Sequence, residues 1–356
     1  MSRLYLLLLL FPFCAGAQKW GKDTSLIYLD ENLEISNAKN AAFAGVSIKV
    51  DGGWMVYAHY PDTTPLLKAY YKDKAHKIKT GPYVAYYPKG IKAKEGFYAD
   101  NKMNSNWQFW YSTGQLKDSG RVIDDYLVGT WKSWHPNGVV MAEANYKEAV
   151  LTNNISLLQQ VALPQTTPPY AYFKDGRYTS WYRNGKIESS GSFLNNKMEG
   201  TWQWYHPNGA PATEETFADG ALVNLQCFDT TGRPTDNLCS IEKPALLKHY
   251  GDYRTFIFEN LTWPDEARKK RIQGDVRVQL TVTKAGKLEN LSITAEAPLL
   301  QKAVEQLFEQ MKEWYPAISH NREVDWHDEV IIPFRLNNNE ATYDILLKGK
   351  TNISTE

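Results

Sequence analysis

A short motif of the form Gly-x-Trp-x-x-Trp/Tyr-x-x-Asn-Gly recurs through the middle of this chain. Its closing glycines lie 24, 24, 47, 24 and 23 residues apart, and 47 is the sum of 24 and 23, which leaves room for one degenerate copy. A fixed period of this length predicts an array in which one small unit stacks on the next. We therefore expect a scaffold with an extended face rather than an enzyme with a deep pocket. The closing glycines are Gly90, Gly114, Gly138, Gly185 and Gly209, and a looser copy ends at Gly232.

Each copy is predicted to be a β-hairpin. In the copy that closes at Gly209, residues 201–205 form the first strand, residues 206–209 the turn and residues 212–217 the return strand. Asn and Gly accept a positive φ and Pro207 fixes the approach to the turn, so this tetrapeptide favours a tight connection.

Three large side chains recur in each copy at fixed distances from the closing glycine. This spacing sets the rings of successive hairpins in register, and each ring buries on the order of 150–250 Å². We expect most of them to form a buried seam, with only the intermediate residues Phe109 and Trp204 pointing outward. The positions are Tyr83, Trp107, Trp131, Tyr178 and Trp202 seven residues before the glycine, Tyr86, Trp110, Trp134, Trp181 and Tyr205 four before it, and Tyr98, Val122, Tyr146, Phe193 and Phe217 eight after it.

Two further sets of glycines carry structural predictions. Gly96, Gly120 and Gly191 follow the closing glycine by six residues, where a strand is expected to bulge or to approach a neighbour closely. The second set opens the repeat units, where we expect the chain to turn back between hairpins. It consists of Gly81, Gly129, Gly176 and Gly200.

This pattern resembles MORN-type repeats, in the variant found in YwqK-like, antitoxin-type repeat proteins, over about residues 81–232. Residues 200–209 match it closely, whereas Ser105 and Val223 depart from it. Between Gly138 and Gly185 the motif lapses into Leu157-Leu158 and the Pro-rich residues 164–169, and we expect a degenerate repeat that carries a loop. The resemblance implies a shape and a tendency to bind proteins or membranes, and no chemistry.

Residues 18–80 contain no copy of the motif. Residues 25–29, 46–50 and 55–60 have the composition of short strands between Gly and Asp turns. We expect a β-rich cap here, because the outermost repeat of an array has no neighbour to cover its apolar side.

A small α+β module is predicted for residues 240–337, followed by a tail at 338–356. Residues 264–271 have the charge order of a helix, with Pro264 and acidic residues first and the basic residues 268–271 last. Residues 276–282 alternate like a strand, Gly286 turns the chain into a second strand, and residues 330–336 form a third. A helical stripe covers the sheet. It consists of Leu300, Val304, Leu307, Met311 and Trp314.

This module resembles the TonB carboxy-terminal domain nearly from end to end. The resemblance is carried by residues 260–267, residues 273–278, the Gly286 turn, residues 311–317 and residues 332–336. It implies a three-stranded antiparallel sheet with two helices, and capture of a protein segment that adds a strand to an exposed sheet edge. Carried over, the partner-binding edge is Val330, Ile331, Ile332, Phe334, Arg335 and Leu336, and Pro333 is tolerated on such an edge. An energy transducer of this family also has an uncleaved membrane helix and a long Pro-rich spacer, so we do not expect energy coupling here.

Residues 1–17 have the pattern of an export signal. Arg3 precedes the apolar residues 4–13, and the small residues 15–17 offer a cleavage site. Ten apolar residues span about 15 Å as a helix, half of the hydrocarbon core, so a cleaved signal is favoured over an anchor. Bulky residues before Cys14 argue against a lipoprotein. We expect an exported protein of the periplasm or envelope of a Gram-negative cell, not integral to the membrane once the signal is cleaved.

The cysteines and histidines each allow a functional interpretation, as a disulfide or a metal ligand, and a purely structural one. Cys227 and Cys239 form a candidate disulfide, worth roughly 3 kcal/mol in the chain-entropy model, and two thiols that never meet remain the alternative. His135 and His206 occupy a slot that is Tyr in other copies, which favours packing. His320 and His327 lie near three carboxylates, but a loop between helix and strand is favoured over a metal site. Residues 268–271 favour a helix end over a grip on carboxylates or lipid headgroups.

Lysine plus arginine equals aspartate plus glutamate at 40 each, so the net charge of zero speaks against nucleic acid as a partner. We expect no cofactor, no metal and no enzymatic activity. The principal prediction is an exported scaffold whose TonB-like domain binds an envelope protein, in one version a segment of an outer-membrane transporter. The alternative is a repeat protein that binds a glycan or a surface through an aromatic face.

Overall fold

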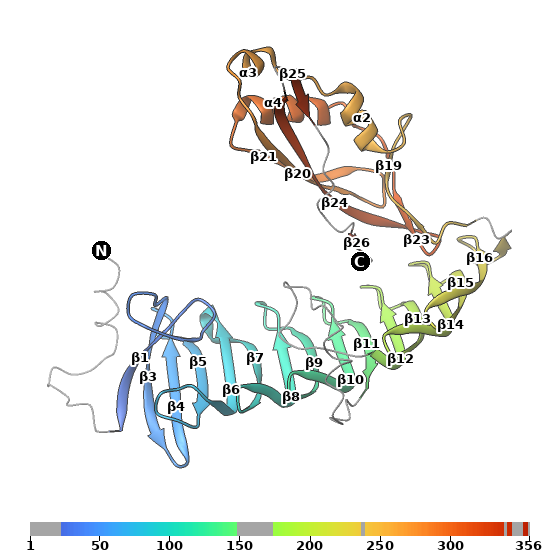
Figure 1. The fold of residues 1–356 in the computed structure, drawn as a ribbon. Coiled ribbons are helices and arrows are strands. Elements are labelled where there is room, and N and C mark those ends of the chain that lie inside the picture. Colours follow the sequence, from blue (N-terminus) through green and yellow to red (C-terminus); the bar gives the residue numbers. More distant parts are fainter. Residues whose placement is uncertain (1–22, 148–173, 236–238, 338–339, 344–351, 355–356) are drawn as a thin grey trace. The chain divides into compact units, whose positions relative to one another are not determined.

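The computed structural model describes residues 23–147, 174–235, 239–337, 340–343 and 352–354 (Figure 1). The fold is mainly β, with a hairpin array followed by a domain of sheet and helices. The described chain divides into two compact units. The first runs to Trp202 and includes Thr216–Val223, and the second holds Gln203–Glu215 and the residues from Asn224 onward. The boundary expected near residue 239 therefore falls inside the second unit.

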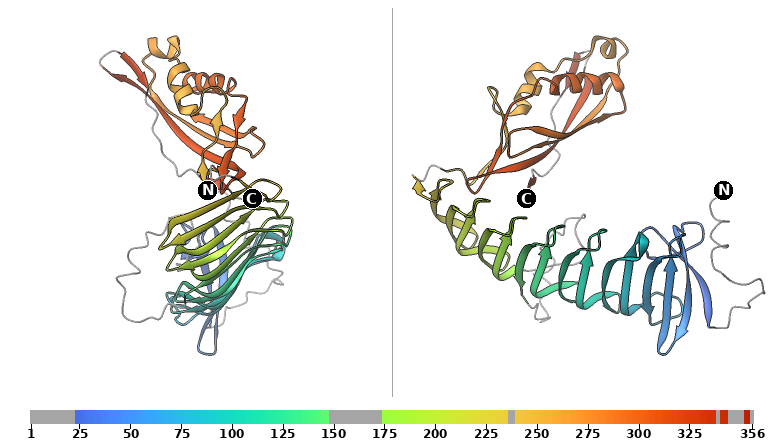
Figure 2. Two further views of the ribbon diagram at one scale, coloured as in Figure 1. Left: turned by 90° about the vertical axis from the view of Figure 1, so that its right-hand side faces the viewer. Right: turned by 180° about the vertical axis from the view of Figure 1, so that it is seen from behind.

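Antiparallel strands joined in chain order build the array. From β3 to β13 every described strand pairs with the next, β1 pairs with both β2 and β3, and Figure 2 shows the strands of the first unit side by side in chain order. Strands β13 to β16 continue as neighbours in the same sheet, and β16 pairs with β17. The strands are β1 (Thr24–Leu29), β2 (Ile35–Ser36), β3 (Phe43–Val50), β4 (Gly53–His59), β5 (Pro65–Tyr71), β6 (Lys79–Tyr87), β7 (Ile91–Ala99), β8 (Lys102–Trp110), β9 (Leu116–Ile123), β10 (Tyr126–Trp134), β11 (Val140–Tyr146), β12 (Lys174–Trp181), β13 (Ile187–Leu194), β14 (Lys197–Tyr205), β15 (Pro211–Ala218), β16 (Ala221–Phe228) and β17 (Pro234–Thr235).

The predicted turn recurs with the same backbone hydrogen bonds. At Gly114 the glycine N–H donates to Tyr111 O, and Tyr111 N–H donates to Gln115 O. The same two bonds close the turns at Gly138, Gly185, Gly209 and Gly232, where φ lies between 81° and 88°. They also close turns at Leu33 (φ 64°) and Thr63 (φ 69°). The repeat turn thus extends into residues 18–80, where other residues replace the glycine.

A different turn joins one hairpin to the next, and it corrects a prediction. Both central residues have positive φ at Asp100-Asn101, Asp124-Asp125, Asn195-Asn196 and Asp219-Gly220, which is the pattern of a type I′ turn. The glycines expected to turn the chain back lie instead inside strands. They are Gly81 in β6, Gly129 in β10, Gly176 in β12 and Gly200 in β14, all with positive φ. Strand registers shift near several of them, which is typical of β-bulges.

The other glycine set allows close approach, as predicted. Tyr83 pairs with Gly96, Trp107 with Gly120 and Tyr178 with Gly191 in the strand registers. A Cβ added at Gly96, Gly120 or Gly191 would overlap the indole ring of Trp107, Trp131 or Trp202. Each of these rings therefore lies directly on the backbone of the preceding strand.

The aromatic seam is buried at its seven-before positions. Trp107, Trp202, Tyr83 and Trp131 are at most 4% exposed, and Tyr178 is half-buried. The ring centroids of Tyr178 and Trp202 are 5.7 Å apart and those of Tyr83 and Trp107 6.1 Å. The four-before residues are half-buried throughout. They are Tyr86, Trp110, Trp134, Trp181 and Tyr205.

The expectation that Phe109 and Trp204 point outward is wrong. Phe109 is half-buried and its ring centroid lies 5.9 Å from that of Trp107. Trp204 is 4% exposed. The Phe109 ring packs between those of Trp107 and Trp131, and the Trp204 ring stacks on that of His320.

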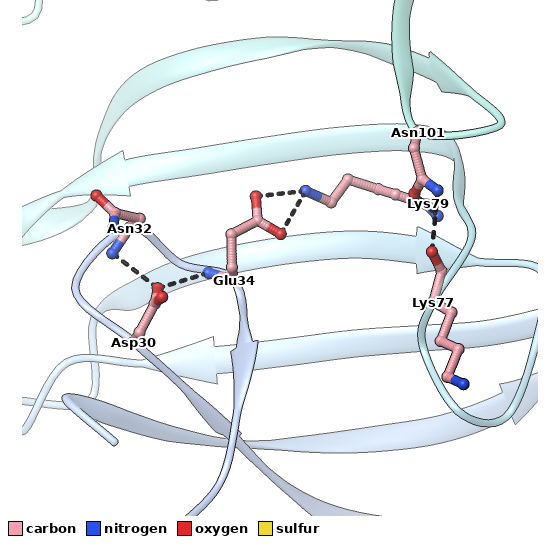
Figure 3. A network of polar contacts seen from close by, with 6 residues as sticks. All are labelled: Asp30, Asn32, Glu34, Lys77, Lys79 and Asn101. Carbon is pink, nitrogen blue, oxygen red and sulfur yellow. Dashed lines mark hydrogen bonds and ion pairs between the residues drawn. The ribbon is translucent and has the colours of Figure 1, made fainter. Parts of the chain in front are cut away.

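A network of polar contacts that includes Glu34 and Lys79 lies at the N-terminal end of the array (Figure 3). The Nζ of Lys79, which is 8% exposed, contacts both oxygens of Glu34 at 2.8 and 3.1 Å. The same ammonium lies 4.9 Å from the centroid of the Tyr98 ring and 5.5 Å from that of Tyr83, within cation–π range. Glu34 belongs to the turn before β2, so this early segment reaches β6 and covers seam rings. Such cover is the role expected of a cap.

In the second unit, strands β18 to β26 and three helices form the C-terminal domain. The sheet order is β18-β23-β24-β20-β21, with β25 and β26 also paired to β24 and a separate β19–β22 pair. Helix α4 packs against β20 and β21 (Figure 1). The elements are β18 (Glu242–Lys243), β19 (Leu246–Leu247), α2 (Tyr253–Asn260), α3 (Asp265–Lys269), β20 (Gly274–Val282), β21 (Leu288–Ala295), α4 (Pro298–Phe308), β22 (Trp314–Tyr315), β23 (Ala317–Ser319), β24 (Arg322–Asn337), β25 (Glu340–Tyr343) and β26 (Asn352–Ser354).

The domain has one helix more than predicted. Helix α2 was missed; Asp252 caps it by accepting a hydrogen bond from Arg254 N–H at 3.0 Å. The predicted helical stripe is also too long, because α4 ends at Phe308 and Trp314 lies in β22. Met311 and Trp314 are nevertheless 1% and 2% exposed, so they belong to the same core as Leu300 and Val304.

Candidate protein-binding edge

Strand β24 carries the residues predicted to bind a partner, and one of its edges is occupied by β20 over residues 326–334. It pairs with β20 from Gly274↔Phe334 to Val282↔Trp326. The side chains of Val330, Ile332 and Phe334 are fully buried, and Ile331 is 8% exposed. A partner at this strand would therefore meet mainly backbone N–H and C=O groups along its second edge.

That second edge is partly covered by the chain itself, which corrects the predicted site. Strand β23 pairs with residues 322–324, β26 with 325–327 and β25 with 334–337. Phe334 thus pairs with β20 on one side and β25 on the other, and Arg335 and Leu336 pair with β25. None of these three predicted residues lies on an open part of the second edge. Among the described residues, no strand pairs with residues 328–333 on this side. We call residues 328–333 the edge window.

A buried ion cluster lies at the start of the edge window. Asp328 is 6% exposed, forms an ion pair with Arg254 and accepts a hydrogen bond from the Tyr253 hydroxyl at 2.7 Å. Burial, followed by the nearby Asp328 carboxylate, raises the pKa of Tyr253, so its hydroxyl stays protonated and donates. Sequence reasoning missed this cluster, because the three residues come from α2 and β24, about 75 positions apart.

The helix-free face of the same sheet is polar and hollowed. Ion pairs Arg277–Glu329 and Arg335–Asp275 cross neighbouring strands. A cavity of about 560 Å³ lies here. Its lining is Gly274, Asp275, Arg277, Thr294, Ala295, Glu296, Ile331 and Arg335. Ile331, which belongs to the edge window, thus contributes apolar surface beside paired charges.

Strand β21 forms the opposite border of the sheet. Within the described residues it pairs with β20 alone. Its residues 289–292 are exposed, and Asn290 has a φ of 49°, which breaks the regular strand geometry. An irregular strand is a poor template for strand addition, so β24 remains the better candidate edge.

The four histidines considered as possible metal ligands lie in separate surroundings within the described structure. His135 Nε2 donates to Trp181 O at 2.8 Å, just as Tyr111 Oη donates to Trp134 O, so it performs the bonding role of the tyrosine it replaces. His206 is buried and its pKa is lowered by burial and by Arg322. His327 contacts Thr281, whereas His320 contacts Glu215. Over the described part of the chain, no group of three or more metal-ligating side chains comes together.

Cys227 and Cys239, the predicted pair, form a disulfide with a Cα–Cα distance of 6.0 Å. Residues 1–17 with Cys14, residues 157–158 and 164–169, and most of the 338–356 tail lie outside the described residues. Two of the basic residues 268–271 form ion pairs with the first turn of α3, Arg268 with Asp265 and Lys270, just after the helix, with Glu266. No helix of the described residues has the length and apolarity to span a membrane.

A second hollow lies on the array, over β7 to β10. Its volume is about 600 Å³. It is lined by Glu95, Asn106, Gln108, Ser119, Gly120, Arg121, Val128, Gly129 and Thr130. Most of these side chains are polar, and no seam aromatic is among them.

Comparison with known protein families agrees with both halves of this architecture. A family model described as a MORN repeat variant matches residues 127–148, 174–195 and 198–219, the hairpins that turn at Gly138, Gly185 and Gly209. A model described as the Gram-negative bacterial TonB protein C-terminal matches residues 259–336, from the end of α2 to the end of β24. No curated protein matches the chain. The chain thus joins an array of variant MORN repeats to a C-terminal domain of the TonB type, a combination that fits a protein-interaction role in the cell envelope.

Proposed function

We propose that this is an exported, non-enzymatic protein of the Gram-negative envelope whose C-terminal domain captures a protein segment as an added strand on β24. The observation that carries the proposal is the edge window, residues 328–333 of β24 in a TonB-type domain, which pairs with β20 on one side and has no partner strand on the other within the described structure. Main-chain hydrogen bonds give such complexes their affinity.

The chain's own strands indicate how a guest would lie. Strands β25 and β26 both run antiparallel to β24 on the same edge, at residues 334–337 and 325–327. A guest therefore either occupies the six-residue edge window between them or replaces them. An antiparallel guest would continue the pairing pattern that this edge already supports.

Two features support a scaffold role for the array. Its largest side chains pack on one another, and its turns are bonded to their neighbours, for example Asn137 Nδ2 to Arg183 O at 2.9 Å. The apolar run at residues 4–13 supports export. Capture of an envelope protein, in one form a segment of an outer-membrane transporter, is the expected outcome.

Site-specific photo-crosslinking in living cells tests the proposal. A photoreactive amino acid at Glu329, inside the edge window, should crosslink a partner protein. The same amino acid at Ser292 on β21 should not, because that strand lies at the far border of the sheet. Equal crosslinking from both positions, or none from Glu329, would contradict capture at β24.

A second candidate function is glycan binding by the array, at a polar hollow rather than at the aromatic seam. The observation that favours it is the polar hollow over β7 to β10, where amide and hydroxyl side chains line about 600 Å³. Affinity electrophoresis in polysaccharide gels checks it. Asn106→Ala with Gln108→Ala should abolish retardation if the hollow binds sugar, and unchanged retardation would exclude it.

A further inference from the structure

The tip of the β23–β24 hairpin has the geometry of a turn between repeats. Its two central residues, His320 and Asn321, have φ values of 48° and 60°. The repeat connection Asn195-Asn196 has 49° and 66°. The C-terminal domain therefore presents, at the start of β24, the type of turn that the array uses between its own hairpins.

This tip contacts the last hairpins of the array, all within the second compact unit. The His320 ring stacks on Trp204, with ring centroids 3.8 Å apart and planes 10° from parallel. His320 Nδ1 lies 2.8 Å from an oxygen of Glu215, which is fully buried. Asn321 Nδ2 donates to Phe228 O at 2.9 Å and approaches Ala212 O at 3.4 Å.

Repeat logic shows what the tip replaces. In earlier copies the side chain three residues before the turn residue donates to a carbonyl of the next copy: Tyr60 to Tyr86 O, Tyr87 to Trp110 O, Tyr111 to Trp134 O and His135 to Trp181 O. The corresponding pair at the end of the array is His206 and Phe228 O. Within the described residues His206 Nε2 instead has no hydrogen-bond partner, and Phe228 O accepts a hydrogen bond from the amide of Asn321.

The docked arrangement leaves buried polar atoms unpaired. Besides His206 Nε2, the second carboxylate oxygen of Glu215 is buried and has no hydrogen-bond partner in the part of the chain that the structure describes. Thr213 Oγ1 and His320 both contact the other oxygen. An unpaired buried polar atom costs free energy that water would return on exposure. Docking is thus supported by stacking and by the Asn321 amide, and opposed by these two atoms.

We infer that Trp204, Glu215 and the Phe228 carbonyl form a socket, and that the His320-Asn321 tip is a releasable plug in it. The plug stands in for the next repeat and covers the end of the array. The Cys227–Cys239 disulfide adjoins the socket, since Cys227 precedes Phe228. Strand β24 begins at Arg322, directly after the plug, so His320 and Asn321 are positioning residues for the strand whose edge captures the guest, and in that respect the inference rests on the proposed function.

Hydrogen–deuterium exchange on the full-length oxidised protein tests the plug without any guest. Asn321→Asp keeps the shape and tolerates the positive φ but loses the amide donor, and Asn321→Gly tolerates the φ without any side chain. Both variants should speed exchange in residues 317–324 roughly fivefold, the factor expected for one lost hydrogen bond. The matched control, Asn137→Asp, removes only the donor to Arg183 O inside the array and should leave residues 317–324 unchanged.

The outcomes are distinct from those of the capture experiment. Unchanged exchange at residues 317–324 in both Asn321 variants would overturn the plug, as would an equal increase there in the Asn137 control. Absence of crosslinking from Glu329 in the protein with Asn321 intact would refute capture while leaving the exchange result intact. If the Asn321 variants exchange faster but crosslink from Glu329 as strongly as the wild type, the plug is a cap of the array and its link to β24 is refuted.

Discussion

Glycines that accept an aromatic ring on their backbone make the array possible. At Gly120 the indole of Trp131 occupies the space in which any larger residue would place its Cβ, and the same holds for Gly96 with Trp107 and Gly191 with Trp202. A ring that lies flat on the neighbouring strand keeps the hairpins close and in register. The requirement here is space rather than a special backbone angle.

Gly120→Ala should therefore destabilise the array by about 1–3 kcal/mol, the usual cost of overpacking. Urea unfolding followed by tryptophan fluorescence measures it. Gly129→Asn is the control, because nothing lies within 4 Å of an added Cβ there and Asn accepts its φ of 66°. A midpoint for Gly120→Ala no lower than that of the control would show that the ring contact does not limit stability.

We expect His76, in the N-terminal part of the array, to make the stability of the array depend on pH. Ser47 is fully buried and its hydroxyl lies 2.6 Å from His76 Nε2. Burial lowers the pKa of His76 below its ordinary value of 6.5, and Asp73 opposes this only in part. The folded state thus prefers neutral imidazole, which contributes stability above about pH 6.5 that is lost as pH falls through the lowered folded pKa.

Thermal unfolding from pH 7.5 to pH 5 should show this loss, and His76→Asn should reduce it. Asn accepts the φ of 55° at this position and does not titrate. His206 also has a lowered pKa, so part of the slope will remain in the variant. Identical slopes in the wild type and His76→Asn would exclude His76 as the titrating group.

At the scale of elements, the repeat period predicted the hairpins and their turns, because the motif records both the turn residue and the rings. The motif did not predict the two turns before residue 80, because Leu33 and Thr63 replace the closing glycine there. Both turns keep the hydrogen bonds of the repeat turn. The connections between hairpins were not predicted either, because Asp-Asn, Asp-Asp, Asn-Asn and Asp-Gly are equivalent in a type I′ turn but share no letter pattern. Helix α2 has only two turns, which is too short for a periodic signal.

Thr63 has a strained backbone conformation because it occupies the position of the closing glycine in the repeat turn. It is β-branched and holds a φ of 69°, where the copies that close at Gly114, Gly138, Gly185, Gly209 and Gly232 place glycine. Thr63→Gly should stabilise the protein by about 1 kcal/mol, the typical cost of a left-handed residue. Thr80→Gly, inside strand β6, should destabilise it instead. A Thr63→Gly variant that unfolds at lower urea than the wild type would contradict this assignment of the turn.

At the scale of the whole molecule, the sequence predicted an array joined to a TonB-type domain, and the family matches confirm that combination. The binding edge was predicted less completely. The residues on β24 were correct for the strand, but the tail after it carries no motif, so its pairing with residues 325–327 and 334–337 could not be foreseen. Nor could a periodic motif show that Gln203–Glu215 belongs with the C-terminal domain.

The central claim is that a guest pairs with the second edge of β24, and a reversible lock on that edge tests it most directly. Arg335 and Thr342 are register partners on β24 and β25, so cysteines at both positions should form a disulfide that holds β25 in place. Lys132 and Glu143 are register partners with solvent-accessible side chains on β10 and β11 in the first compact unit, and they provide a matched control pair that removes no contact of the β24 edge.

Affinity for the crosslinked partner is then measured by calorimetry with both pairs oxidised. The account predicts that the Arg335→Cys/Thr342→Cys lock lowers affinity at least tenfold, a change of about 1.4 kcal/mol. The control pair should bind like the wild type. Full affinity with the edge locked would contradict capture by strand addition on β24.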